Sequence, residues 1–236
     1  PWNDKTKYLQ WDKKAGPYRV AIVNGFVGNT WRIQMIKTAK AYAEDPAIKD
    51  KIAEFKVVST GTDAPAQLGA IEDFINQGYD AIVTIAVAPD GFDRVIRLAD
   101  KNNVVLVPFD NVLDTDAVMQ VNEDQLAMGR MWAEFVIKEL AAAGVTEGKI
   151  LEVRGLPGNS VDRDRSIGIN EVIAASGGAW EMVSVVGNWD DGTTQKVVAD
   201  AIAVHGQFAA IVGQGGSNGV IQALKDAGHP WVPVAG

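Results

Sequence analysis

Ten polar or aromatic residues follow the carboxyl ends of the predicted strands, and their side chains are of types that bind a small polar molecule. Amide, carboxylate and guanidinium groups donate and accept hydrogen bonds with adjacent hydroxyls. Tryptophan faces stack on the apolar C–H face of a sugar ring. The set therefore predicts a site for a polyhydroxylated ligand. Its members are Asn24, Phe26, Asn29, Trp31, Asp110, Asn111, Asn122, Arg165, Trp189 and Gln214.

Each of these residues also has a purely structural interpretation. Asn and Asp after a strand are often turn residues or helix N-caps, and Trp31 and Trp189 are also acceptable as core aromatics. Arg165 belongs to a DRDR run, which by itself is more typical of a solvated helix face. Binding is favoured because all ten residues share one edge of the predicted sheets, and open α/β sheets bind ligands beyond the carboxyl ends of their strands.

Signatures of catalysis and of nucleotide binding are missing from the sequence. The turns Gly25–Gly28 and Gly213–Gly216 depart from the GxGxxG pattern, and no Walker motif is present. An HExxH motif is also absent. His205 and His229 stand near helix ends, where C-terminal capping or a surface position is expected. We therefore expect a protein that is not an enzyme.

Composition narrows the remaining classes of function. The chain has 236 residues, of which 47% are hydrophobic and 22% charged, enough for a sizeable core. Its net charge of −8 disfavours a nucleic-acid partner. Cysteine is absent, and the acidic pairs Asp162/Asp164 and Asp190/Asp191 lack the spacing of cation ligands, so we expect no metal and no cofactor. No signal-peptide segment is seen at the start, as in a processed exported protein or a cytosolic one.

The segment Tyr18–Ala43 sets the pattern for the rest of the chain. Its apolar run Val20–Val23 shows no polar alternation, which is typical of a strand buried on both faces of a parallel sheet. A glycine-rich turn follows, and a helical pattern begins near Thr30. Parallel strands require such helical crossovers.

The same strand–helix unit repeats along the chain and predicts an α/β protein built from two doubly wound parallel sheets. We expect further strands at residues 55–59, 81–87, 104–109, 117–121, 149–153, 182–187, 209–212 and 232–235. Helices are expected after the N-cap Asp63 and at residues 90–101, 125–143, 161–175, 193–204 and 218–227. Ser160 and Ser217 are the predicted N-caps of two of these helices.

Three segments follow from this pattern. Residues 1–17 are an N-terminal lead-in whose Trp2 and Trp11 pack on a lobe surface. Residues 18–121 form the N-terminal lobe and residues 122–236 the C-terminal lobe, with a hinge near Asn122. The sequence closes on a strand without a following helix, so the second lobe is expected to be truncated at its C-terminus.

A set of motifs in this order resembles one known family. VAIVNGFVGNTW, AIVTIAVAP, VVLVPFDN, MQVNEDQLAMGR, LEVRGLPGNSVDRDRSIG and AAIVGQGGSNGVIQAL are similar to the periplasmic sugar-binding proteins of ABC importers. The ribose- and galactose-binding type, a type I periplasmic binding protein, is the nearest, and it shares its fold with lactose-repressor-like effector domains. The resemblance covers about residues 18–236.

The resemblance implies roles for individual residues. Ligand contacts fall on Asn24, Asp110, Asn122, Arg165 and Gln214, and stacking aromatics on Trp31 and Trp189. Ribose binders have an arginine at the position of Asn111, so the resemblance does not extend to ribose itself. The family pattern also continues past residue 236 with a further acidic contact.

The expected function is a solute receptor. It binds a monosaccharide or polyol in a cleft between the lobes, closes by hinge bending, and delivers the ligand to an ABC permease in the membrane. A monomer in the periplasm or another extracytoplasmic space, with or without a lipid anchor, is expected. The alternative is the effector-binding domain of a sugar-responsive transcriptional regulator, which would need a preceding helix-turn-helix. An enzyme on the same scaffold is a third class that no residue set supports.

Overall fold

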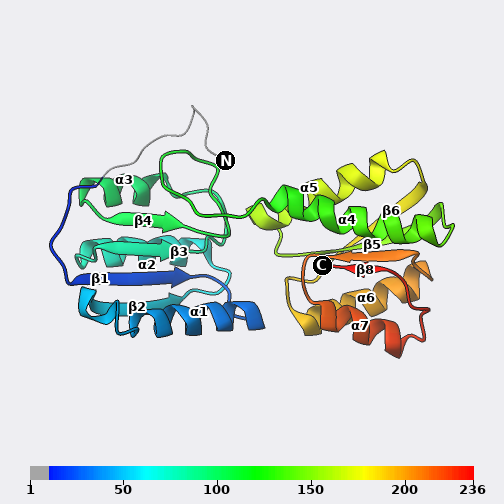
Figure 1. Ribbon diagram of the computed structural model, residues 1–236, viewed down its shortest axis with the longest axis horizontal. Helices are drawn as coiled ribbons and strands as arrows, with labels where there is room; N and C mark the ends of the chain where they lie inside the picture. The colour runs from blue at the N-terminus through cyan, green and yellow to red at the C-terminus, as the bar shows by residue number, and fades with distance from the viewer. Residues whose placement is uncertain (1–10) are drawn as a thin grey trace. The chain divides into compact units, whose positions relative to one another are not determined.

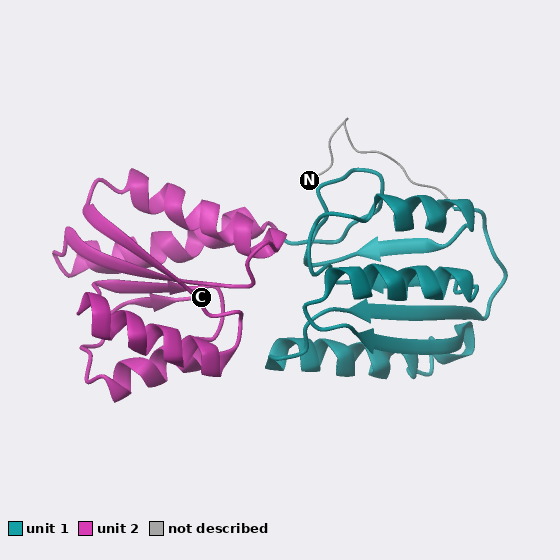
Figure 2. Ribbon diagram, turned by 180° about the vertical axis from the view of Figure 1, so that it is seen from behind, with its two compact units in different colours: residues 1–123 teal, residues 124–236 magenta. Residues whose placement is uncertain are grey.

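The computed structural model describes residues 11–236, and the chain divides into two compact units. Unit 1 comprises residues 1–123 and unit 2 residues 124–236 (Figure 2). Each unit is a parallel four-stranded sheet with helices between successive strands (Figure 1). The predicted α/β class with two parallel sheets is therefore confirmed. No helix among residues 11–236 has the length and hydropathy needed to cross a bilayer.

The sheet of unit 1 has the strand order β2-β1-β3-β4, and all its pairs are parallel. Its strands are β1 (Tyr18–Asn24), β2 (Ile52–Ser59), β3 (Ala81–Thr84) and β4 (Val105–Pro108). Its helices are α1 (Thr30–Ala43), the 3-10 turn η1 (Lys49–Lys51), α2 (Ala64–Asn76) and α3 (Asp93–Lys101). Because β1 lies between β2 and β3, the turns that follow these strands emerge next to one another.

The core of unit 1 lies on one face of this sheet. Val23, Ile82 and Leu106 point to that face and pack against apolar residues of α2 and α3, among them Ile71 and Val95. This burial is the main stabilising contribution of the unit, at about 25 cal/mol for each Å² of apolar surface removed from water. Residues that alternate with them on the strands are mostly half-buried, and α1 contacts the edge strand β2.

The sheet of unit 2 has the equivalent strand order β6-β5-β7-β8 and is also wholly parallel. Its strands are β5 (Glu147–Arg154), β6 (Ala179–Val186), β7 (Ala210–Gly213) and β8 (Val234–Ala235). Its helices are α4 (Gln125–Ala142), α5 (Ser160–Ala175), α6 (Asp191–His205) and α7 (Ser217–Asp226). Both faces of the sheet are covered, since Ile150 packs with α4 and α5 while Leu151 packs with α6 and α7.

Three local predictions are wrong. Residues 117–121 form no strand and contribute a single parallel bridge between Phe109 and Val121. The side chain of Gln120 accepts from the Leu113 N–H and donates to the Leu113 and Thr115 carbonyls, which holds this segment as a loop.

The helix caps at Ser160 and Ser217 are the other two errors. Asn159 caps α5 through its side chain, which accepts from the Val161 N–H at 2.9 Å, and Ser160 is already helical. Gly216, with φ of 76°, precedes α7, and Ser217 is the first helical residue. Both helices thus begin one residue earlier than predicted.

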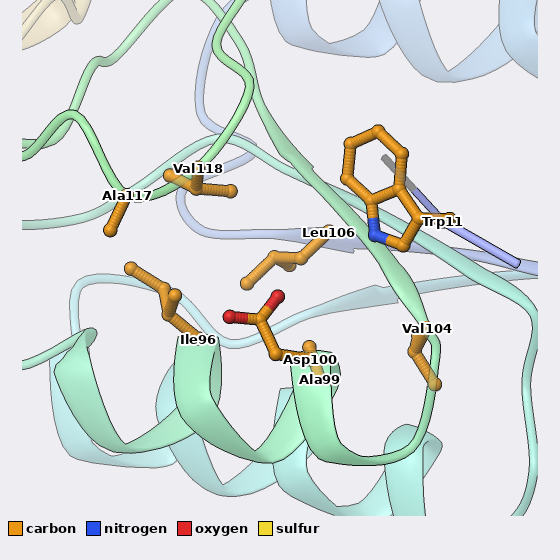
Figure 3. A pocket seen from close by; sticks show the side chains of 8 residues that line it. All are labelled: Trp11, Ile96, Ala99, Asp100, Val104, Leu106, Ala117 and Val118. Carbon is orange, nitrogen blue, oxygen red and sulfur yellow. The ribbon is translucent and has the colours of Figure 1, made fainter. Parts of the chain in front are cut away.

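The described part of the N-terminal lead-in packs on unit 1. Trp11 lines a cavity of about 40 Å³ together with Ile96, Leu106 and Val118 (Figure 3). The predicted packing of Trp11 on a lobe surface is confirmed, whereas Trp2 lies outside the described residues. Hydrogen bonds between Asp12 and Asn103 fix the segment near the amino end of β4.

Helices α4 and α5 approach each other closely through two glycines. A Cβ atom on Gly129 would lie 2.2 Å from the carbonyl oxygen of Arg165, and one on Gly168 would lie 2.2 Å from that of Leu126. Both neighbours are backbone atoms of the facing helix, which cannot move independently. The spacing of α4 and α5, and with it the position of Arg165, therefore depends on these glycines.

Replacing Gly129 by Ala should destabilise the protein by about 1–3 kcal/mol, the usual cost of overpacking, although alanine is the better helix former. Gly69→Ala is the matched control on α2, because nothing lies within 4 Å of its added Cβ. That change should stabilise the protein by up to about 1 kcal/mol. Urea unfolding of both variants measures the difference, and equal effects would contradict the close approach.

Candidate functional site

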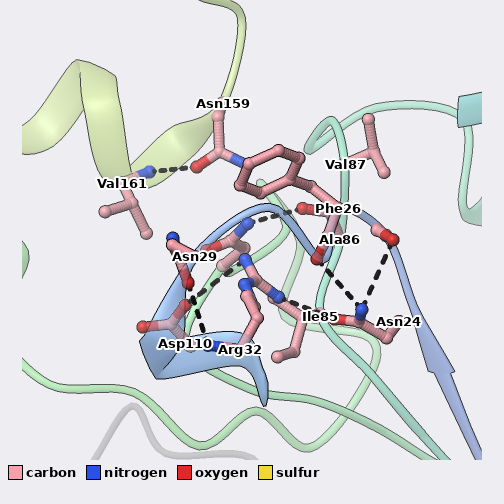
Figure 4. Close-up of polar contacts among 12 residues, drawn as sticks. Asn24, Phe26, Asn29, Arg32, Ile85, Ala86, Val87, Asp110, Asn159 and Val161 are labelled. Atoms are coloured by element: carbon pink, nitrogen blue, oxygen red, sulfur yellow. Dashed lines mark hydrogen bonds and ion pairs between the residues drawn. The ribbon is translucent and has the colours of Figure 1, made fainter. Parts of the chain in front are cut away.

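The carboxyl edge of the unit 1 sheet is organised around Asn24, the last residue of β1, which is wholly buried. Its Nδ2 donates to the Phe26 carbonyl at 3.0 Å and to Ser59 Oγ at 3.2 Å. Its Oδ1 accepts from Nη1 of Arg32 at 3.0 Å (Figure 4). Asn24 therefore joins the turn after β1, the end of β2 and the first turn of α1.

Two further buried polar side chains form hydrogen bonds with the backbone at this edge. Gln67 on α2 donates to the Ile85 carbonyl and accepts from the Val87 N–H, both at 2.8 Å. Thr84 Oγ1 donates to the Val23 carbonyl at 2.9 Å. These bonds satisfy backbone groups where the strands end, so the turns after β1 and β3 are held in one arrangement.

Arg32 is the one buried residue of α1, and the sequence reasoning missed it. It is 5% exposed and lies 3.9 Å from the carboxylate of Asp110 (Figure 4). Burial lowers the pKa of Arg32 to about 10, and the charge of Asp110 only partly offsets this effect. A signal was present in the sequence, because residue 32 lies in the first turn of a helix that starts at the predicted edge.

Asp110 and Asn111 come two and three residues after the end of β4 at Pro108. Asp110 adopts φ of 61°, a left-handed conformation that Asp tolerates better than most residues. Asn111 is 3% exposed and donates to the Ala86 carbonyl at 2.7 Å. Its Oδ1 is buried without a hydrogen-bond partner among the described residues. Asn111 thus has a structural role in addition to its position at the edge.

The remaining predicted residues of unit 1 differ in exposure. Asn29 is the N-cap of α1 and accepts from the Arg32 N–H at 2.9 Å, in line with the structural interpretation of such residues. Trp31 is 50% exposed, so it is not a core aromatic. Phe26 packs over Gly28, where a Cβ atom would meet its ring. Asn122 is exposed in the segment before α4.

In unit 2 the carboxyl edge is organised around Arg165 on α5. Its Nε donates to Gln125 Oε1 at 2.7 Å and its Nη1 to the Gln214 carbonyl at 3.2 Å. The guanidinium carbon lies 5.1 Å from the centre of the Trp132 ring. Gln214 is 3% exposed and donates to the Asp162 carbonyl. Arg165 is therefore held at the edge and does not lie on a freely solvated helix face.

A second ion pair, which was not predicted, lies beside this group. Asp162 is 1% exposed and accepts hydrogen bonds from Nε and Nη2 of Arg154 and from the Gly155 N–H. These bonds to Asp162 are the main cause that raises the pKa of Arg154 above its ordinary value. Asp162 therefore ties the end of β5 to the first turn of α5.

Trp189 and Asp190 follow β6. Trp189 is half-buried, with a left-handed backbone (φ 56°). Asp190 is the N-cap of α6 and accepts from the Thr193 N–H at 2.7 Å. The hydrogen bonds from Thr193 lower the pKa of Asp190. Asp190 thus has a structural role as the N-cap of α6. Trp189 takes no part in this cap.

The structure places nine of the ten predicted residues in two groups, one in each unit, and leaves Asn122 exposed in the segment before α4. Asn24, Phe26, Asn29, Trp31, Asp110 and Asn111 belong to the edge of unit 1, and Arg165, Trp189 and Gln214 to that of unit 2. His229 follows the end of α7, as predicted, and its backbone N–H donates to the Leu224 carbonyl; its side chain is buried and accepts from the Phe208 N–H. Within residues 11–236 no cluster of three His, Cys, Asp or Glu could hold a metal ion.

The two ion pairs should respond differently to loss of their cation. Arg154→Met leaves the buried Asp162 carboxylate without its counter-charge and should cost about 3 kcal/mol or more. Arg32→Met should cost about 1–2 kcal/mol, because loss of the hydrogen bond to the buried Asn24 Oδ1 and of a long ion pair is partly offset by removal of the desolvation of Arg32. Chemical denaturation measures both values. A larger loss for Arg32→Met would contradict this assignment.

The lowered pKa of Asp190 predicts a pH effect. A carboxyl group whose pKa is lower in the folded state stabilises the fold above its unfolded pKa, and this contribution is lost as the pH falls through the folded value. Asp190→Asn keeps the cap but cannot titrate, so it should be less stable than wild type at pH 6 and approach it near pH 2. Asp190→Ala should cost about 1 kcal/mol at neutral pH. Parallel stability curves for wild type and Asp190→Asn would refute the assignment.

Comparison with known proteins gives consistent matches. Residues 20–236 match the family model described as a periplasmic binding protein domain. The xylitol-binding protein of Mycolicibacterium smegmatis is 27% identical over 182 residues, which cover 75% of this chain and 51% of that protein. The galactofuranose-binding protein of Escherichia coli is 25% identical over 91% of this chain and 68% of its own length.

A solved structure agrees with these sequence matches. The crystal structure of an ABC transporter solute-binding protein from Thermobispora bispora superposes with a TM-score of 0.83 at 27% identity, covering 92% of this chain and 67% of that one. The chain thus spans about half to two thirds of the length of these relatives. Periplasmic binding proteins are solute receptors and not enzymes. The chain belongs to the periplasmic binding protein domain family.

Proposed function

We propose that the protein is the solute-binding receptor of an ABC importer and that its ligand is a monosaccharide or polyol. The ligand contacts the carboxyl edges of both units in a cleft between them, and the segment around Asn122 is the hinge. The closed form is presented to the membrane permease on the extracytoplasmic side. The named relatives bind xylitol and galactofuranose, which supports a hydroxyl-rich ligand.

One observation supports an uncharged ligand: at the edge of each unit a carboxylate lies next to an arginine. Asp110 lies beside Arg32 in unit 1, and Asp162 is bonded to Arg154 in unit 2. Neither pair therefore needs a charged ligand for compensation. The groups around them are amides and indoles, which suit the hydroxyls and the C–H faces of an uncharged sugar.

The buried acceptors at these edges favour the same class. Asn111 Oδ1 and Gln214 Oε1 are buried without hydrogen-bond partners among residues 11–236. An unsatisfied buried acceptor costs about 1–3 kcal/mol. Ligand hydroxyls, or water molecules that relay to them, supply the missing donors. A site built in this way discriminates against analogues that lack a hydroxyl.

The transport receptor is favoured over the effector domain of a transcriptional regulator. The relatives and the solved structure named above are binding proteins, and one is an ABC transporter component by its description. Nothing in the geometry of either edge favours a regulator specifically.

A thermal-shift screen tests the proposal, with xylitol, D-ribose, D-galactose, L-arabinose and glycerol as probes. A ligand at a hundredfold excess over its dissociation constant stabilises the folded state by about 2.7 kcal/mol, which gives a clear rise in Tm. Calorimetry then measures the affinity of the best probe. Trp31→Ala and Arg165→Ala should each weaken its binding by roughly 2–4 kcal/mol, as for truncated anchor residues of interfaces.

Trp231→Ala is the matched control, because Trp231 is 64% exposed and precedes β8 at the amino edge of the unit 2 sheet. It should leave the affinity unchanged. Wild-type affinity in both site variants would reject the assigned residues. A screen in which no sugar or polyol raises the Tm, while charged solutes do, would reject the ligand class.

A further inference from the structure

Trp189 has a backbone conformation that a large side chain rarely adopts. Asn188 and Trp189 have φ values of 54° and 56°, so two successive residues other than glycine are left-handed. Such conformations are strained and persist where the surrounding contacts hold them in place. The pair lies between β6 and α6.

Two glycines at the ends of the neighbouring strands contact this indole. A Cβ atom on Gly155, which follows β5, would lie 2.1 Å from Cε2 and 2.3 Å from Cζ2 of Trp189. One on Gly215, after β7, would lie 3.1 Å from Cδ1. Since β5 pairs with both β6 and β7, the three turns emerge side by side. The indole therefore packs directly on the backbone of adjacent turns.

The two glycines are required for different reasons. Gly215 has φ of 145°, so its own backbone favours glycine. Gly155 lies outside the left-handed range, so an alanine there avoids the strain of a positive φ. What excludes a side chain at residue 155 is the indole itself. Gly155 is therefore the position at which contact with Trp189 can be tested separately from backbone strain.

We propose that Gly155 and Gly215 are positioning residues for Trp189. Because neither residue has a side chain, the indole packs directly on their backbone. This backbone surface of Gly155 and Gly215, the seat, fixes the angle of the indole at the carboxyl edge of unit 2. The ring is thereby prepared to stack on a ligand without ordering at the moment of binding. The stacking part of this proposal rests on the proposed sugar or polyol function, whereas the seat itself does not.

Fluorine NMR of protein labelled with 5-fluorotryptophan tests the seat without a ligand. The chain has seven tryptophans, so Trp189→Phe identifies one resonance among seven. Ring position 5 is opposite Cε2 in the six-membered ring and therefore carries fluorine away from the carbon nearest Gly155. Gly155→Ala should shift the Trp189 resonance and leave the other six in place. An unshifted Trp189 resonance overturns the proposal.

Gly192→Ala is the matched control, since its added Cβ meets only Asp190 Oδ1 at an ordinary 3.5 Å. It should leave the Trp189 resonance in place. A double-mutant cycle covers the case in which Gly155→Ala folds poorly. In a Trp189→Ala background the ring is gone, so Gly155→Ala should no longer lower the Tm. An equal loss of Tm in both backgrounds overturns the proposal.

Binding of the tightest probe from the sugar and polyol panel gives the functional readout. Gly155→Ala should weaken binding at least about tenfold when Trp189 is present, and should have no effect in the Trp189→Ala background. The same loss in both backgrounds would show that Gly155 does not act through the indole. If wild type binds no probe, the proposed function fails, while the NMR and Tm results still decide whether the seat exists.

Discussion

Parallel pairing of every strand is the constraint on which both candidate edges depend. Strands that run in one direction end at one edge of the sheet, and each must be followed by a crossover helix. The turn after a strand and the first turn of the next helix are therefore neighbours of the turns from adjacent strands. In unit 1 this places Asn24 of β1 within hydrogen-bonding distance of Arg32 on α1 and of Ser59 on β2.

The same constraint explains why the edges contain so many polar side chains. Where a parallel strand ends, its last backbone groups lose their partners but remain partly buried, so side chains must satisfy them. Gln67 and Thr84 do this in unit 1, and Asp162 does so for the Gly155 N–H in unit 2. Groups that satisfy the backbone also fix the side chains of the candidate site, so the same bonds contribute to stability and to the order of this edge.

The sequence predicted those features that depend on neighbouring residues, and it failed where contacts outside a local pattern decide the structure. The helix Thr30–Ala43 and the buried strands followed from local hydrophobic patterns, and their boundaries differ by a few residues at most. Residues 117–121 are also mostly apolar, but the bonds of Gln120 to Leu113 and Thr115 hold them as a loop. Those bonds join residues that no periodic pattern connects.

The candidate site shows the same division. Amides, acidic residues and tryptophans at strand ends could be named from the sequence because their position along the chain is regular. Arg32 was missed because its significance comes from burial against Asn24 and Asp110, which its position in the first turn of α1 does not by itself reveal. The left-handed backbone of Trp189 was equally invisible, since nothing in the local sequence distinguishes it from an ordinary turn.

Arg32 also changes the meaning of Asn111. The resemblance to ribose binders implies an arginine beside the acidic residue after β4, and its replacement by Asn111 suggested that a guanidinium was missing from this edge. The structure has one there nonetheless, supplied from α1, 3.9 Å from Asp110. A positive charge at this edge is thus supplied from α1, although residue 111 carries none. Because a planar guanidinium bonds in fixed directions, its origin on a helix bears on which hydroxyl pattern the proposed site accepts.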